Sequence, residues 1–132
     1  TIIKALGNCG TNLGIAIQIR NDLKELFQNE SGGQMAGDEV LNKKKILPIV
    51  YALEIANAGQ KRRLGEIYLK RILEPQDVIA LRTALQEMEV SQFCEETIVK
   101  YLKKAGSEIN IDGISKEGKS NIEKFMSILA SA

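Results

Sequence analysis

Apolar residues recur at helical spacing along almost the whole chain, and strand signals are nearly absent. Val78, Leu81, Leu85 and Met88, for example, follow steps of three and four residues, which place them on one helix face. Clusters of glycine, proline and polar residues interrupt such runs. The pattern predicts about six helices, over residues 2–29, 46–57, 60–73, 76–88, 91–109 and 116–130. We therefore expect an all-α fold.

The long first helix of this prediction contains three glycines, Gly7, Gly10 and Gly14. A glycine inside a helix costs up to about 1 kcal/mol relative to alanine, so three of them need a reason. Close packing of this helix against a neighbouring helix is the explanation that we favour. Room for a ligand chain beside the helix is the alternative.

Composition and charge narrow the class of protein. The chain has 132 residues, of which 44% are hydrophobic and 27% are charged, so it suits one domain, or part of one, with a packed core. Its net charge of +1 gives no electrostatic argument for a nucleic-acid partner. No apolar run is long enough for a transmembrane helix, and no signal-peptide pattern is present.

The two cysteines, Cys9 and Cys94, lack the spacing of metal ligands, and the chain has no histidine. We expect both cysteines to be reduced and buried, as in a cytoplasmic protein. The lack of histidine excludes Ser-His and Cys-His nucleophiles and histidine-based zinc sites within this sequence. A metal ion here has to be a hard cation that oxygen atoms bind.

One face of the first helix carries a polar cluster that consists of Gln18, Asn21, Asp22 and Glu25. Residues three and four apart are neighbours on a helix, so this face presents two carboxylates and two amides together. Mg²⁺ suits such a site, because one or two carboxylates and substrate phosphates usually hold it. The alternative is an ordinary solvated surface, which the nearby charges of Arg20 and Lys24 favour.

A second candidate site is the stretch NKKKILP, residues 42–48, in which lysines lead into the start of a helix. Lysines bind phosphate as point charges, and a helix N-terminus adds N–H donors and a favourable dipole. An exposed basic loop is the alternative. A cation bound by the acidic cluster on one side, and lysines that include Lys43 and Lys44 on the other, would together hold a diphosphate and stabilise its charge as it departs.

The stretch LGIAIQIRNDLKELFQNESGGQMAGDEVLNKKKILPIVYALE resembles the second acidic region of the trans-isoprenyl diphosphate synthases, the polyprenyl synthetase family. The matching residues, in order and spacing, are Gly14, Gln18, Ile19, Asp22, Gly33, Gly37, Lys44, Leu47 and Pro48. Residues 1–58 carry the specific signal. The helices from 60 to 132 are compatible with the family, as they are with other helical bundles.

This resemblance implies an isoprenoid-synthase-type helical bundle and a Mg²⁺-dependent reaction between an allylic diphosphate and isopentenyl diphosphate. The resemblance makes Asp22, Gln18 and Lys44 the catalytic candidates. Asp22 and Glu25, with Asn21, become the metal candidates, and Lys43 and Lys44 the diphosphate candidates. It also implies a homodimer.

The sequence departs from the family pattern in ways that put ordinary chain elongation in doubt. Asn21 and Glu25 stand where the family has aspartates, and Gln34 stands where it usually has a lysine. Only the second acidic motif is present, and the chain opens inside a helical pattern. We therefore expect residues 1–132 to be the C-terminal part of a polyprenyl-synthetase-like domain, which is inactive alone and self-associates through exposed core-facing residues.

Two alternatives to a synthase remain open. Some relatives that transfer isoprenyl groups to bacterial pheromone peptides carry an altered second motif, so a peptide acceptor is one alternative. Some synthases are heterodimers in which one subunit only shapes the cavity, so a non-catalytic subunit is the other.

Overall fold

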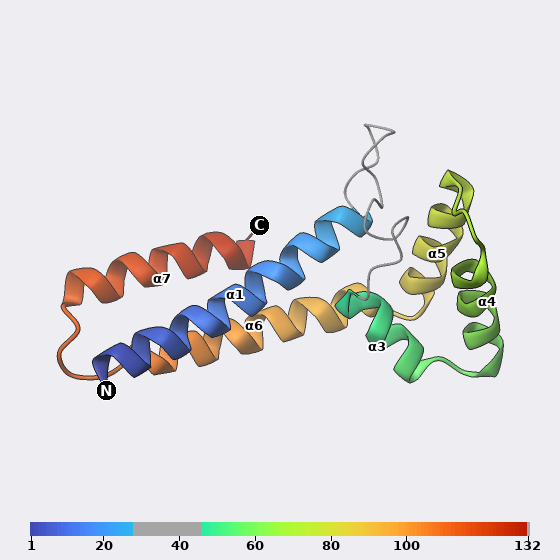
Figure 1. Ribbon diagram of the computed structural model, residues 1–132. Coiled ribbons are helices and arrows are strands. Elements are labelled where there is room, and N and C mark those ends of the chain that lie inside the picture. The colour runs from blue at the N-terminus through green and yellow to red at the C-terminus, as the bar shows by residue number, and fades with distance from the viewer. Residues whose placement is uncertain (28–45, 132) are drawn as a thin grey trace. The chain divides into compact units, whose positions relative to one another are not determined.

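The fold was examined in a computed structural model, which describes residues 1–27 and 46–131. Helices make up the ordered secondary structure of these two ranges, and neither range contains a strand. The helices are α1 (Ile2–Phe27), α3 (Leu47–Ile55), α4 (Ala58–Leu69), α5 (Pro75–Glu87), α6 (Val90–Glu108) and α7 (Lys116–Ser131). Figure 1 shows them in chain order. The all-α prediction is confirmed, and so are its six helices.

The start of α4 differs from the prediction by two residues, because a capping box extends the helix. The Asn57 side chain accepts a hydrogen bond from the Gln60 N–H at 2.9 Å, and the Gln60 side chain accepts one from the Asn57 N–H at 2.9 Å. This reciprocal pairing satisfies two backbone donors that the helix leaves open. Residues 58 and 59, which the prediction left between two helices, therefore belong to the first turn of α4.

The end of α4 also differs, since the helix stops at Leu69 and not at residue 73. Lys70 has extended backbone angles, and its ammonium group lies 2.6 Å from the Asp77 carboxylate in the first turn of α5. Pro75 opens α5, where its missing N–H costs nothing. Pro48 likewise lies in the first turn of α3, as predicted.

The described residues fall into two compact units, which are considered separately. The first unit holds residues 1–20 and the residues from 95 onward, and the second holds the described residues between 21 and 94. The helices α1 and α6 each contribute residues to both units. No helix in the described ranges is long and apolar enough to cross a membrane.

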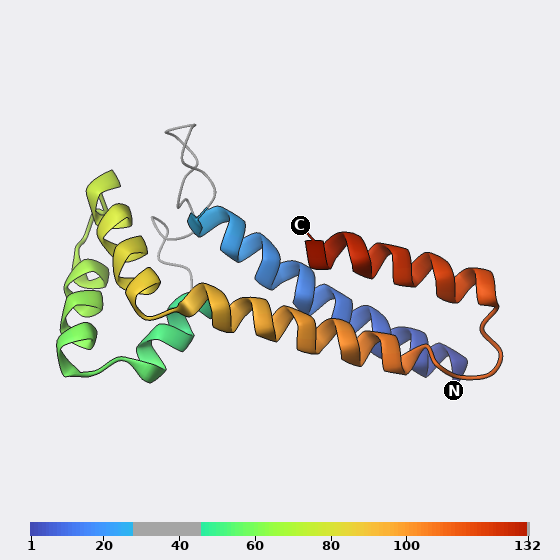
Figure 2. The same ribbon diagram turned by 180° about the vertical axis from the view of Figure 1, so that it is seen from behind.

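In the first unit, α1, α6 and α7 pack around a small apolar core (Figures 1 and 2). Cys9 of α1 meets Ala105 of α6 there, and Met126 of α7 packs against them. The Asn8 amide donates to Glu108 at 3.4 Å, while Arg20 bonds Glu95, so α1 and α6 run antiparallel. No α7 side chain is fully buried, so this helix covers the core with only one stripe.

In the second unit, α3, α4 and α5 pack with the end of α1 and the start of α6. The rings of Tyr51 and Phe93 stack with their centroids 3.5 Å apart, which joins α3 to α6. The Arg82 Nε donates to the carbonyl oxygen of Leu26, which joins α5 to the last turn of α1. Leu64, Leu81 and Leu85 are among the largest fully buried side chains.

Both cysteines are free and buried, which confirms that part of the prediction. The exposed fraction is 3% for Cys9 and 0% for Cys94. Burial and the nearby Glu108 carboxylate raise the pKa of the Cys9 thiol, so the neutral thiol is favoured.

Candidate metal and diphosphate site

The last turns of α1 carry all four residues of the predicted polar cluster, and the structure gives them different surroundings. Gln18 and Asn21 are exposed, Glu25 is half-buried and Asp22 is buried. Gln18, Asp22 and Glu25 each take part in a further polar or electrostatic interaction. The helix therefore brings the four together as predicted, but it presents the two amides to solvent more than the two carboxylates.

The burial of Asp22 speaks against an ordinary solvated face. Its exposed fraction is only 5%, and it is one of three buried charged residues in the described ranges, with Arg20 and Asp77. Aspartate is seldom buried without a partner, because desolvation of its charge is costly. Its burial, together with its further interaction, distinguishes Asp22 from a solvated surface carboxylate.

The prediction that Arg20 lies on an ordinary solvated surface of the helix is wrong. The guanidinium is buried and bonds Glu95 of α6 at two points, with Nη1–Oε1 at 2.5 Å and Nη2–Oε2 at 2.9 Å. Its Nη2 also donates to the Ala130 carbonyl oxygen of α7 at 3.5 Å. Arg20 is thus a structural link among three helices, and only Lys24 remains as an exposed charge.

The expected close packing at the α1 glycines is wrong for the described part of the chain. A Cβ atom placed on Gly7, Gly10 or Gly14 meets no atom within 4 Å. By helical position, this open stripe continues into Gln18 and Asn21. Within residues 1–27 and 46–131, no neighbouring helix packs closely against these three glycines.

The lysine cluster lies outside the described residues, as does Gln34. Lys43 and Lys44 belong to the range 28–45, so their predicted contact with a diphosphate stays a prediction. The structure does show the helix that follows them. It starts at Leu47, and the N-cap residue Ile46 provides no side-chain hydrogen bond to its first N–H groups.

The donor set of α1 fits part of a magnesium site. Asp22 and Glu25 offer hard carboxylate oxygens one turn apart, and Mg²⁺ is commonly held by one or two carboxylates with water and substrate phosphates. Within the described ranges, no group of three or more Asp, Glu, Cys or His side chains is placed to hold a metal ion. The two carboxylates fit shared binding with a phosphate ligand better than a site made of protein atoms alone.

Arg82 and Tyr68 are two notable residues that the sequence did not indicate. Arg82 bonds the Leu26 carbonyl oxygen, at the end of the helix that carries Asp22, and its Nη2 is buried without a partner in the described ranges. The Tyr68 hydroxyl is also buried without a described partner, and burial raises its pKa to about 12. Both lie in ordinary helical patterns, so neither carries a signal in the sequence.

No curated protein and no solved structure matches the chain significantly. A family model does match, and its description is polyprenyl synthetase. The match covers residues 1–88, which includes α1 and its acidic turn and extends beyond residue 58, where the recognised motifs end. With two thirds of its length matched, the chain belongs to the polyprenyl synthetase family.

Proposed function

We propose that the protein containing this chain is a Mg²⁺-dependent prenyltransferase that joins an allylic diphosphate to isopentenyl diphosphate. Membership of the polyprenyl synthetase family is the observation that carries the proposal. In this reaction the allylic carbon–oxygen bond breaks, a new carbon–carbon bond forms to isopentenyl diphosphate, and diphosphate and a proton leave. The site therefore has to hold a departing diphosphate and keep water away from the reacting carbons.

Asp22 and Glu25 are the residues that we assign to the metal side of the diphosphate. Bound Mg²⁺ would supply positive charge that stabilises the leaving diphosphate. The burial of Asp22 supports its role, since a carboxylate in a site with little water interacts more strongly with a cation. Glu25 is half-buried one turn later, and the exposed amides of Gln18 and Asn21 supply hydrogen-bonding groups beside it.

Lys43 and Lys44 are assigned to the other side of the diphosphate. Their support is chemical and positional, because they precede the N-terminus of α3 by a few residues and lysine binds phosphate through its charge. The open glycine stripe of α1, whose last glycine lies one turn before Gln18, leaves room for an apolar chain beside this helix.

An assay on the full-length protein tests the proposal. The protein is incubated with Mg²⁺, isopentenyl diphosphate and a short allylic diphosphate, and the products are separated by chain length. We expect elongated product, and we expect Asp22→Ala to abolish it, because the buried carboxylate is lost. Asp112→Ala, at an exposed aspartate of the first unit, is the control and should leave the product yield unchanged.

A gain of function provides a second test. Asn21→Asp restores the carboxylate that the family pattern has, so half-maximal activity should need less Mg²⁺. Full activity of Asp22→Ala would refute the assignment of Asp22. Binding of the allylic diphosphate without any elongation would refute the synthase, and it would favour a peptide acceptor or a cavity-shaping subunit.

A further inference from the structure

The connection between α4 and α5 places two large apolar side chains in water. The exposed fraction is 86% for Leu69, the last residue of α4, and 78% for Ile72 in the connection. Single exposed apolar residues are normal on a protein surface. Two that are nearly fully exposed and only three residues apart, at the tip of a helical hairpin, are less ordinary and need a role.

Basic residues outnumber acidic residues around these two side chains. Residues 61–77 contain five basic residues and three acidic residues, Glu66, Glu74 and Asp77. Arg63 is paired with Glu87 and Lys70 with Asp77. The other three, Lys61, Arg62 and Arg71, form no ion pair within the described ranges.

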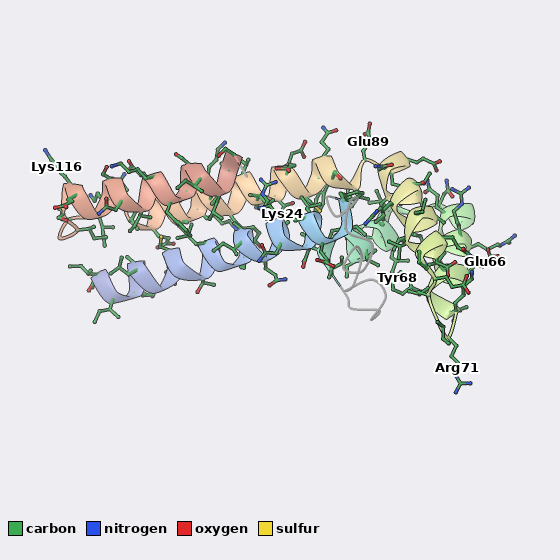
Figure 3. The ribbon with its side chains drawn as sticks, turned by 90° about the horizontal axis from the view of Figure 1, so that it is seen from above. Lys24, Glu66, Tyr68, Arg71, Glu89 and Lys116 are labelled. Atoms are coloured by element: carbon green, nitrogen blue, oxygen red, sulfur yellow. The ribbon has the colours of Figure 1, made fainter. Side chains whose placement is uncertain are left out.

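Of these three cations, Arg71 is next to the apolar pair, whereas Lys61 and Arg62 lie in the first half of α4. Arg62 lies seven residues before Leu69, two helical turns away on the same side of α4. Arg71 lies between the two apolar residues in sequence. Figure 3 shows its side chain extending away from α4 and α5, while Glu66 and Tyr68 point away from one another.

The tip is held by defined contacts, so these side chains are presented by a fixed backbone. Lys70 Nζ lies 2.6 Å from Asp77 Oδ1, and Asp77 Oδ2 accepts a hydrogen bond from the Glu74 N–H at 2.8 Å. Leu73, next to Ile72, is buried with an exposed fraction of 8%. The chain therefore anchors Leu73 and leaves Leu69 and Ile72 outside.

We propose that this basic apolar tip, formed by Leu69, Arg71 and Ile72 with Arg62 two turns away on the same side of α4, docks on the surface of an anionic lipid membrane. Leu69 and Ile72 would enter the boundary between headgroups and acyl chains, and Arg62 and Arg71 would meet the negative headgroups. Apolar insertion combined with basic charge is what peripheral binding to anionic lipid requires. The two signals are small, so the binding is reversible. This inference goes beyond the proposed function and does not depend on it.

A bare acidic protein partner fits the tip less well. An acidic protein surface would pair with the cations, but without a groove of its own it would leave Leu69 and Ile72 in water. A lipid surface accepts a protruding aliphatic side chain at any point, so it uses both features of the tip.

Flotation of the full-length protein with lipid vesicles tests the proposal. Phosphatidylcholine vesicles are compared with vesicles that also contain about 30% phosphatidylserine. We expect binding to the anionic vesicles only, and weaker binding at high salt. Arg71→Gln should reduce the partition coefficient about fivefold. The pair Leu69→Ser and Ile72→Ser should reduce it by on the order of tenfold or more.

A matched control is the pair Ile3→Ser and Ile128→Ser, which removes apolar side chains that are 88% and 64% exposed elsewhere. This pair should leave vesicle binding unchanged. Equal binding to both kinds of vesicle, no binding to either, or an equal loss in the control pair would each overturn the proposal.

A fluorescence experiment locates the contact, because the sequence has no tryptophan. In a fragment that shows the expected flotation, or in a tryptophan-free version of the full protein, Ile72→Trp should shift its emission to shorter wavelength on anionic vesicles. Ile3→Trp should show no shift. A shift at Ile3 and none at Ile72 would show that another surface touches the lipid.

Discussion

Arg20 and Asp22 lie two residues apart on α1, and both are buried charged residues. They differ in how much the sequence revealed about them. The place of Asp22 in the polar cluster of α1 was predictable, because the residues of that cluster lie within about two turns of each other. The burial of Arg20 was not, since its partner Glu95 lies 75 residues away. Local spacing predicts which residues are neighbours along a helix. It does not predict which residue far away in the sequence will contact them.

The buried guanidinium of Arg20 leads to a prediction about stability. Glu95→Ala leaves that cation in a low-dielectric site without its carboxylate, so the free energy of unfolding should fall by about 1–3 kcal/mol. Urea unfolding measures the loss, provided that the slope against urea concentration stays the same. Glu123→Ala removes an exposed glutamate from α7 and serves as the control. A loss no larger than in the control would show that the pair contributes little.

At the scale of elements, helix type and order followed from the apolar spacing, while the ends of α4 did not. The end of α4 depends on the ion pair between Lys70 and Asp77, which forms only when α5 folds back. The start depends on the reciprocal bonds of Asn57 and Gln60. Both ends are set by hydrogen bonds of polar side chains, to which a count of apolar positions is insensitive.

The Asp77 carboxylate gives a prediction for the dependence of stability on pH. The hydrogen bond from Lys70 and then that from the Glu74 N–H lower its pKa below the ordinary value of 3.8. The folded state therefore binds the proton less well than the unfolded chain. The stabilising contribution is complete above the unfolded pKa and is lost as the pH falls through the lower, folded pKa.

Unfolding midpoints measured from neutral to acidic pH check this effect. Asp77→Asn should be less stable than the unaltered chain at neutral pH, and the difference should shrink at the acid end. Lys70→Met should keep part of the pH dependence, because the Glu74 N–H still donates to Asp77. A constant gap between Asp77→Asn and the parent at all pH values would contradict the predicted link.

At the scale of the whole molecule, exposed apolar residues occur in both units. In the first unit they include Ile3, Phe125 and Ile128, with exposed fractions of 88%, 45% and 64%. The sequence predicted such surfaces only through its resemblance to a larger fold, because an apolar residue looks the same whether a partner covers it or not. The structure identifies which residues are uncovered in the ranges 1–27 and 46–131.

Self-association of residues 1–132 is the corresponding prediction. Sedimentation at increasing concentration should show a rising average mass, since association removes apolar surface from water. The variant Phe125→Ser with Ile128→Ser should shift this rise to higher concentration, whereas Ser127→Ala, between them in sequence, should not. A mass that stays monomeric across the concentration range would contradict the prediction.

The open glycine stripe of α1 makes this helix a starting point for engineering heat resistance. Gly7→Ala, Gly10→Ala and Gly14→Ala add methyl groups where no described atom lies within 4 Å, and each should raise stability by up to about 1 kcal/mol. Gly113→Ala is the opposite control, because φ is +97° there and the added Cβ would lie 2.6 Å from Ile2 Cδ1. Thermal melting separates the two cases.

Measuring melting temperature and catalytic rate for the same three substitutions shows whether stability and catalysis need the same surface of α1. If melting temperature rises while the full-length protein keeps its catalytic rate, catalysis does not require these glycines, and replacing them gives a more heat-resistant protein. If melting temperature rises and the rate falls, the space above the helix is occupied during turnover. Thermal stability and catalytic rate would then place opposite requirements on three positions in successive turns of α1. The change in rate per added methyl group would measure that conflict.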